Sequence, residues 1–159
     1  MRRKDREITE LGRLTEIVAQ CRVCRIAMAD GDGLYIVPMN FGYRVQEGRI
    51  TLYFHSAAEG RKVEALRDNP HVCVEMDCSH QLIEAKAACG YTYAYASLIG
   101  WGRARFLSEP EDKKAALSTI MRHQTGRDFA FTDQMAQGVC VFQVELEQLS
   151  GKEHSASSQ

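Results

Sequence analysis

The sequence predicts a mainly β protein, an antiparallel barrel of about six to seven strands with peripheral helices. Two observations predict it: short runs of alternating apolar and polar residues are separated by glycine-containing turns, and helical segments interrupt these runs only irregularly. A doubly wound parallel sheet would need strands and helices in regular alternation, which this chain lacks. We therefore expect one domain over residues 1–154, followed by a serine-rich, disordered tail over 155–159.

The first half of the chain predicts an antiparallel meander that follows a helix. Apolar residues at helical spacing favour a helix over 8–20. Alternating patterns favour strands over 22–29, 34–43 and 49–55. Glycines lie in the turns between these strands, and glycine supplies the positive φ that tight hairpins need.

The second half mixes strands with inserted helices. We expect helices over 57–68 and 109–123, a helical turn over 132–137, and strands over 71–77, 97–107 and 139–147. Ser108 and Glu111 have the spacing of a capping box at the start of the second helix, and Gly126 is a plausible stop for it. Residues 79–96 contain many alanines and three tyrosines, and their pattern predicts no definite structure.

Composition limits the class of protein. The chain has 159 residues with a net charge of −1, which suits one domain and gives no electrostatic attraction to nucleic acid or to an anionic membrane. No apolar run approaches the roughly 20 residues that a membrane helix needs. No apolar signal-peptide core follows the basic start, so we expect a cytoplasmic protein with reduced thiols.

The most informative segment is the junction between the strand over 49–55 and the helix after it. Ser56 and Glu59 have the spacing of a capping box, and Arg61 and Lys62 follow within the first turns. Cations are unfavourable at a helix N-terminus, which is already partly positive, so a bound anion would resolve the conflict. Gly60 would let a ligand approach the backbone closely. This combination predicts a phosphate site, and the alternative is a solvated helix start with both cations in water.

The preceding strand adds a second indication. Pro38 cannot donate a ladder hydrogen bond, so it marks a sheet edge or a bulge where a flat ligand could reach the backbone. Asn40 shares its face and is polar among apolar neighbours. The alternative is an ordinary edge strand.

In their order along the chain, these motifs resemble the pyridoxamine 5′-phosphate oxidase-like, FMN-binding split-barrel family. More narrowly, they resemble its nitroimidazole-resistance branch. The matching segments are 1–8, 37–43, 53–56, 60–62, 69–70, 95–104 and 149–153. The resemblance thus spans nearly the whole chain.

The resemblance implies FMN bound between the two subunits of a homodimer. It implies that the phosphate lies on Ser56, Arg61 and Lys62, and that the ring system lies against Val37, Pro38, Met39 and Asn40 and near His55. Ser97 would make a polar flavin contact, and Lys152 would reach the flavin edge from the other subunit. His55 matches the histidine to which a reactive role is given in this branch.

The implied function is an FMN-dependent oxidoreductase that acts on a small-molecule electron acceptor, with NAD(P)H as a candidate electron donor. The alternative is a flavin- or haem-binding redox protein of the same barrel type without turnover. The arginine-rich segment with which the oxidases hold pyridoxal phosphate is absent here, where Gly151-Lys152-Glu153-His154 leads into the serine-rich tail. Oxidation of pyridoxamine 5′-phosphate is therefore not expected.

Two smaller patterns leave alternatives open. His55 shares a strand face with Thr51 and Tyr53, so its imidazole is a candidate proton donor beside the flavin or a simple hydrogen-bonding group. A zinc site at Cys21 and Cys24 would need a second ligand pair, and in a strand their odd spacing would put the two thiols on opposite faces. The candidates are the pair Cys21 and Cys24, the pair Cys78 and His80, and Cys89; buried or unreactive thiols are the alternative.

Overall fold

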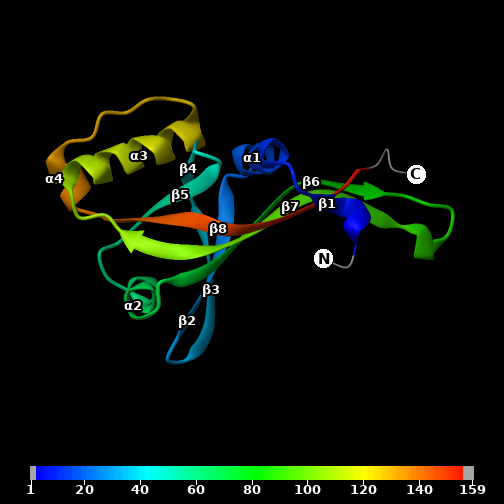
Figure 1. The fold of residues 1–159 in the computed structure, drawn as a ribbon, viewed down its shortest axis with the longest axis horizontal. Helices are drawn as coiled ribbons and strands as arrows, with labels where there is room; N and C mark the ends of the chain where they lie inside the picture. The colour runs from blue at the N-terminus through cyan, green and yellow to red at the C-terminus, as the bar shows by residue number, and fades with distance from the viewer. Residues whose placement is uncertain (1–2, 156–159) are drawn as a thin grey trace.

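The computed structural model describes residues 3–155 and contains one antiparallel sheet that curls into a barrel (Figure 1). The strands follow the order β3-β2-β6-β7-β8-β5-β4, and the short β1 pairs with β8. Their bounds are Glu7–Ile8 (β1), Val23–Asp30 (β2), Gly33–Asn40 (β3), Gly42–Gln46 (β4), Arg49–Ser56 (β5), His71–Ile83 (β6), Thr92–Phe106 (β7) and Cys140–His154 (β8). The predicted fold class, an antiparallel split barrel, is confirmed, but the described residues form eight strands rather than six or seven, because the expected strand over 34–43 is two strands and the short β1 was not foreseen.

Large apolar side chains fill the barrel interior. Ile50, Leu52 and Phe54 are fully buried, while the alternate positions of β5 are partly or fully exposed, as a half-buried strand requires. The rings of Phe54 and Phe142 stack with their centroids 5.0 Å apart, and Phe41 lies 6.4 Å from Phe54. This aromatic group joins β5, β8 and the link between β3 and β4 into one core.

Within residues 3–155, four α-helices and two short 3-10 turns surround the sheet. The helices are Leu11–Gln20 (α1), Arg61–Asp68 (α2), Pro110–Thr125 (α3) and Asp133–Gln137 (α4), and the 3-10 turns are Lys4–Arg6 (η1) and Ala88–Gly90 (η2). Helix α3 lies over β4 and β5 with α4 beside its start (Figure 1). A Cβ at Gly42 of β4 would lie 2.6 Å from backbone atoms of Ile120, so only glycine permits this approach of α3. Among the described residues, none of the helices has the length and apolar character needed to cross a bilayer.

The segment that the sequence left undefined, 79–96, belongs to a long hairpin that projects from the barrel (Figure 1). Strand β6 continues to Ile83 and β7 starts at Thr92, with η2 between them. A register shift between Cys78 and Gln81, with Ser79 at φ 60°, interrupts the pairing. This bulge moves later side chains to the other face, which explains why a simple alternating pattern was not visible.

Several predicted boundaries are wrong. The strand predicted over 34–43 is two strands that meet at Phe41, where the chain bends. The first helix begins at Leu11 because Ile8 already pairs with Gly151 in the sheet, and the last strand extends to His154 rather than ending at 147. Except for residue 155, the predicted tail over 155–159 lies outside the described residues.

The capping box predicted at α3 is also wrong. The N-cap residue is Glu109, no side chain caps the helix, and the Ser108 hydroxyl contacts the Glu109 carboxylate instead. Pro110 occupies the first turn, where its missing N–H has no effect on the helix. At the other end, the predicted stop at Gly126 is confirmed, since this residue adopts a left-handed conformation with φ 71°.

Candidate functional site

The start of α2 differs from the prediction. The helix begins at Arg61 rather than at 57, its N-cap is Gly60, and no side chain caps it. The predicted capping box of Ser56 and Glu59 is therefore wrong. Ser56 is the last residue of β5, where it is nearly buried, and its hydroxyl donates a hydrogen bond of 2.8 Å to the carbonyl oxygen of Ala57.

This geometry leaves the first turn of α2 open. The backbone N–H groups of Arg61 and Lys62 have no hydrogen-bond acceptor among the described residues, whereas those of Val63 and Glu64 bond to the carbonyl oxygen of Gly60. Gly60 adopts φ 124°, and a Cβ there would meet nothing within 4 Å. An uncapped helix N-terminus with open space around its glycine is suited to binding an anion.

The two cations of this turn have different surroundings. The Arg61 guanidinium forms an ion pair with Asp30 at the tip of the β2–β3 hairpin, with an Nε–Oδ2 distance of 2.7 Å, and lies over the Tyr35 ring at 4.5 Å. The hydrogen bond from Arg61 lowers the pKa of Asp30 below its usual range. The Lys62 ammonium has no ion-pair partner among the described residues. Lys62 is thus the free cation of the pair.

Strands β3 and β5 separate next to this turn. The β4–β5 ladder ends at Gly42 and Tyr53, after which β3 pairs only with β2, while β5 continues along β8 to Ser56. Beyond this point β3 and the end of β5 are no longer paired with each other, and we call this interruption of the ladder the split of the barrel. The predicted residues 37–40, 55 and 56 lie on the two strands that separate there, and α2 follows β5 in the chain.

The β3 residues of the predicted site do not share one face. Pro38 and Asn40 are exposed, whereas Val37 packs against the core and Met39 is only 7% exposed within it. The Met39 side chain therefore cannot contact a ligand outside the barrel, and only its backbone remains available. The Asn40 side chain donates to the carbonyl oxygen of Arg22 and to Gln124, each at 3.3 Å.

His55 lies on the outward face of β5, as its position in the alternating pattern predicts. It is exposed, and its imidazole has no hydrogen-bond partner among residues 3–155. In the β5–β8 ladder it is paired with Val141, directly before Ser56. Its side chain is thus free to interact with a ligand next to the start of α2.

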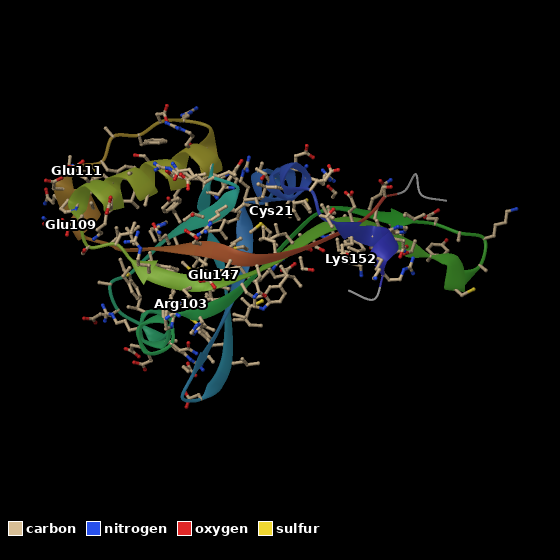
Figure 2. All side chains as sticks on the ribbon, in the orientation of Figure 1. Cys21, Arg103, Glu109, Glu111, Glu147 and Lys152 are labelled. Carbon is tan, nitrogen blue, oxygen red and sulfur yellow. The ribbon has the colours of Figure 1, made fainter. Side chains whose placement is uncertain are left out.

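Ser97 and Lys152 form a separate group. They are paired in the β7–β8 ladder, and the Ser97 hydroxyl donates a hydrogen bond of 3.3 Å to the carbonyl oxygen of Lys152. The Lys152 ammonium lies 5.8 Å from the Tyr95 ring centroid. Figure 2 shows Lys152 on the side of the projecting hairpin, well apart from α2 as Figure 1 places it. One chain therefore does not bring these residues to the start of α2.

Sequence reasoning missed two residues beside the predicted site, Asp30 and Tyr35. Asp30 lies in the glycine-containing turn between the strands predicted over 22–29 and 34–43, and its aspartate–glycine context gives no sign of an ion pair 31 residues away. Tyr35 faces the same guanidinium. Neither residue alone predicts the ion pair. An acidic residue at a hairpin tip and a cation at a helix start can be paired only once β2 is known to contact α2.

The cysteines do not form a metal centre in the described part of the chain, where no group of three or more His, Cys, Asp or Glu side chains could hold a metal ion. Cys21 caps the end of α1, and its thiol contacts the carbonyl oxygen of Asp77 at 3.4 Å, while Cys24 lies in the barrel core. Burial raises the pKa of both thiols to about 12, so both are protonated and unreactive at neutral pH.

Comparison with known proteins places this geometry in context. Residues 12–153 match a family model described as pyridoxamine 5′-phosphate oxidase. A candidate 5-nitroimidazole antibiotic resistance protein from Bacteroides thetaiotaomicron is 35% identical, with a TM-score of 0.81, covering 92% of this chain and 86% of its own. Among curated proteins the sequence has no match.

Two further solved structures share the fold. An FAD-binding protein from Mesorhizobium loti is 25% identical with a TM-score of 0.67, covering 94% of this chain and 98% of its own. An FAD- and haem-binding protein from Mycobacterium smegmatis is 16% identical with a TM-score of 0.81, covering 94% of this chain and 74% of its own. At 16% identity, the similarity to the Mycobacterium smegmatis protein shows only that the two chains share a fold.

Proposed function

Because the chain belongs to the pyridoxamine 5′-phosphate oxidase family, we propose that it binds FMN at the split of the barrel and acts as an FMN-dependent oxidoreductase. The substrate is a small-molecule electron acceptor, and NAD(P)H is the candidate donor. The likeness to a candidate nitroimidazole-resistance protein makes nitroaromatic compounds the first acceptors to test.

The single observation that carries the proposal is the uncapped first turn of α2. This turn carries two backbone N–H groups and the Lys62 side chain, none with a partner among the described residues, and open space at Gly60. A terminal phosphate dianion would satisfy both N–H groups and Lys62 together. Arg61 would join them by exchanging Asp30 for the phosphate, since the ion pair is half-exposed on its arginine side. These residues fit the cofactor.

When bound, FMN would supply the electron-transfer chemistry, and the protein would supply position and protons. Exposed Pro38 and Asn40 on β3 and His55 on β5 border the place for the ring system. The His55 imidazole is exposed and has no hydrogen-bond partner among the described residues, so its ring N–H is suited to donating a proton to the reduced acceptor. A hydrogen bond to the cofactor is its alternative role.

We also propose a homodimer, because Ser97 and Lys152 lie apart from α2 within one chain, and Lys152 would reach the edge of a flavin bound at the split from a second copy. An apolar row on the outward sheet face supports this. Cross-strand pairing aligns Ile36, Ala27, Cys73 and Trp101 across four neighbouring strands, with Ile36 62% and Trp101 43% exposed. Ser97 lies on the same face of β7 as Trp101, so a partner packed over this row would adjoin Ser97 and Lys152.

A visible spectrum of the purified protein, followed by FMN titration of the apoprotein, tests the proposal. We expect flavin absorption, bleaching of that absorption by NAD(P)H, and sedimentation at about twice the chain mass of 17.9 kDa. His55→Ala should retain FMN but lose turnover; loss of FMN would assign His55 the binding role instead. A haem band without flavin, or an apoprotein that does not bind FMN, would overturn the proposal.

A further inference from the structure

A second basic region lies on the side of the barrel covered by α1 and α3, next to the Asn40 end of β3. A cavity of about 610 Å³ opens between α1, β4 and α3. Arg22, Arg44 and Arg122 line it, and no aspartate or glutamate does. We propose that this cavity binds a small aromatic carboxylate, at a site independent of the flavin.

Two of the three guanidinium groups carry uncompensated charge. Arg22 donates to the carbonyl oxygen of Ala19 at 2.7 Å, and Arg44 donates to the Thr119 hydroxyl at 3.2 Å. Within residues 3–155 neither forms an ion pair, whereas Arg122 bonds to Asp128 at 2.7 Å. Each of these two guanidinium groups has N–H donors that the hydrogen bonds above do not use, and two parallel N–H groups of a guanidinium can bind both oxygens of a carboxylate.

The wall between these cations is aromatic and uncharged. His123 packs against Phe41 and Tyr43, with ring centroids 4.9 and 5.0 Å apart. Its Nε2 lies 2.7 Å from the carbonyl oxygen of Cys21, which can only accept, and its Nδ1 lies 3.5 Å from the Arg22 guanidinium, which can only donate. His123 is therefore the neutral tautomer with the proton on Nε2, and burial lowers its pKa.

The chemistry of the lining selects the ligand class. A bare inorganic anion would leave the rings of Tyr43 and His123, which line the cavity, without an apolar partner, and a neutral ring would leave Arg22 and Arg44 without an anion. The volume lies in the range of sites for small molecules. A ring that carries one carboxylate satisfies both parts of the wall, and none of the residues that line the cavity belongs to the predicted flavin site.

Calorimetric titration of the full-length protein with benzoate, benzamide and inorganic phosphate tests the proposal. Benzoate should bind saturably, with benzamide and phosphate each at least about tenfold weaker, because loss of charge-assisted hydrogen bonds or of ring contacts costs at least that factor. The double variant Arg22→Gln/Arg44→Gln should weaken benzoate binding by about tenfold or more. FMN binding should be unchanged in it.

Arg103→Gln is the matched control, because Arg103 lines a different cavity whose other residues include Glu145 and Glu147. It should leave benzoate binding unchanged, and a thermal melt should show that every variant is folded. Equal binding of phosphate and benzoate would overturn the aromatic part of the proposal. Absence of saturable benzoate binding, or wild-type affinity in the double variant, would overturn the site.

Discussion

The two basic regions of this molecule differ in how their charges are held. At the start of α2, Arg61 is neutralised by Asp30, and only Lys62 and backbone N–H groups remain free. In the cavity between α1, β4 and α3, Arg22 and Arg44 are held by neutral groups and keep their full charge. An anion at α2 must displace the Asp30 carboxylate to reach Arg61, whereas an anion in the cavity meets Arg22 and Arg44 without an ion-pair partner among the described residues, and only Arg122 is paired, with Asp128.

This difference has a consequence for selectivity. Displacing Asp30 breaks an existing ion pair, so a monoanion that binds Arg61 gains little binding free energy at α2. A phosphate dianion that also accepts hydrogen bonds from two N–H groups gains much more. In the cavity no carboxylate is paired with Arg22 or Arg44 among the described residues, so these two groups would accept a monoanion. The internal carboxylate thus makes the α2 region the more selective of the two.

The largest expected effect tests the α2 side of this comparison. Replacing both Arg61 and Lys62 by alanine removes two charge-assisted phosphate contacts, each worth about 1.5 kcal/mol or more, so FMN affinity should fall at least about a hundredfold. Titration of the apoprotein by flavin fluorescence quenching measures this. The double cavity variant Arg22→Gln/Arg44→Gln is the control and should bind FMN normally.

Asp30→Asn sharpens the same experiment. Removing the competing carboxylate frees Arg61, so FMN affinity should rise rather than fall. Unchanged affinity in the Arg61/Lys62 double variant would discard the phosphate assignment. A decrease on Asp30→Asn would mean that Asp30 positions Arg61 instead of competing for it.

An intermediate effect is expected at the packing that forms the cavity wall. Gly42→Ala would place a Cβ 2.6 Å from the backbone of Ile120, and backbone cannot move aside as a side chain can. We expect a loss of about 1–3 kcal/mol in the free energy of unfolding, together with weaker benzoate binding as α3 shifts. Urea denaturation measures the first quantity.

Gly12→Ala provides the contrast. This glycine lies in the exposed face of α1 with nothing within 4 Å of a Cβ, so alanine should stabilise the protein by up to about 1 kcal/mol. Equal stability of the Gly42→Ala and wild-type proteins would mean that α3 is not fixed by this contact.

The same two regions mark what the sequence could predict. Gly60, Arg61 and Lys62 are contiguous in the sequence, so their spacing alone predicted a candidate phosphate site. The residue at the start of the helix and the ion pair with Asp30 could not be predicted in this way. Arg22, Arg44 and Arg122 come from three elements, and only the folded chain places them around one cavity. Alternation in β5 predicted its faces correctly, whereas the bulge at Ser79 concealed the hairpin of β6 and β7.

The smallest expected effect concerns His123, whose ring forms part of the cavity wall. Burial lowers the pKa of its imidazole in the folded protein below the ordinary value of 6.5, and the nearby Arg22 guanidinium acts in the same direction. The folded state therefore binds fewer protons than the unfolded state as the pH falls through this range. The contribution of His123 to the free energy of unfolding should be fully present above about pH 6.5 and should decrease as the pH falls from there toward the lowered pKa.

His123→Gln separates this contribution from that of every other titrating group. Glutamine can donate a hydrogen bond to the carbonyl oxygen of Cys21 as the Nε2–H does, yet it does not ionise in this range. Free energies of unfolding measured in urea at about pH 7.5 and 5.5 should show a larger loss for wild type than for the variant. Equal losses would mean that His123 is charged in the folded protein, and the neutral wall assigned to the cavity would then be wrong.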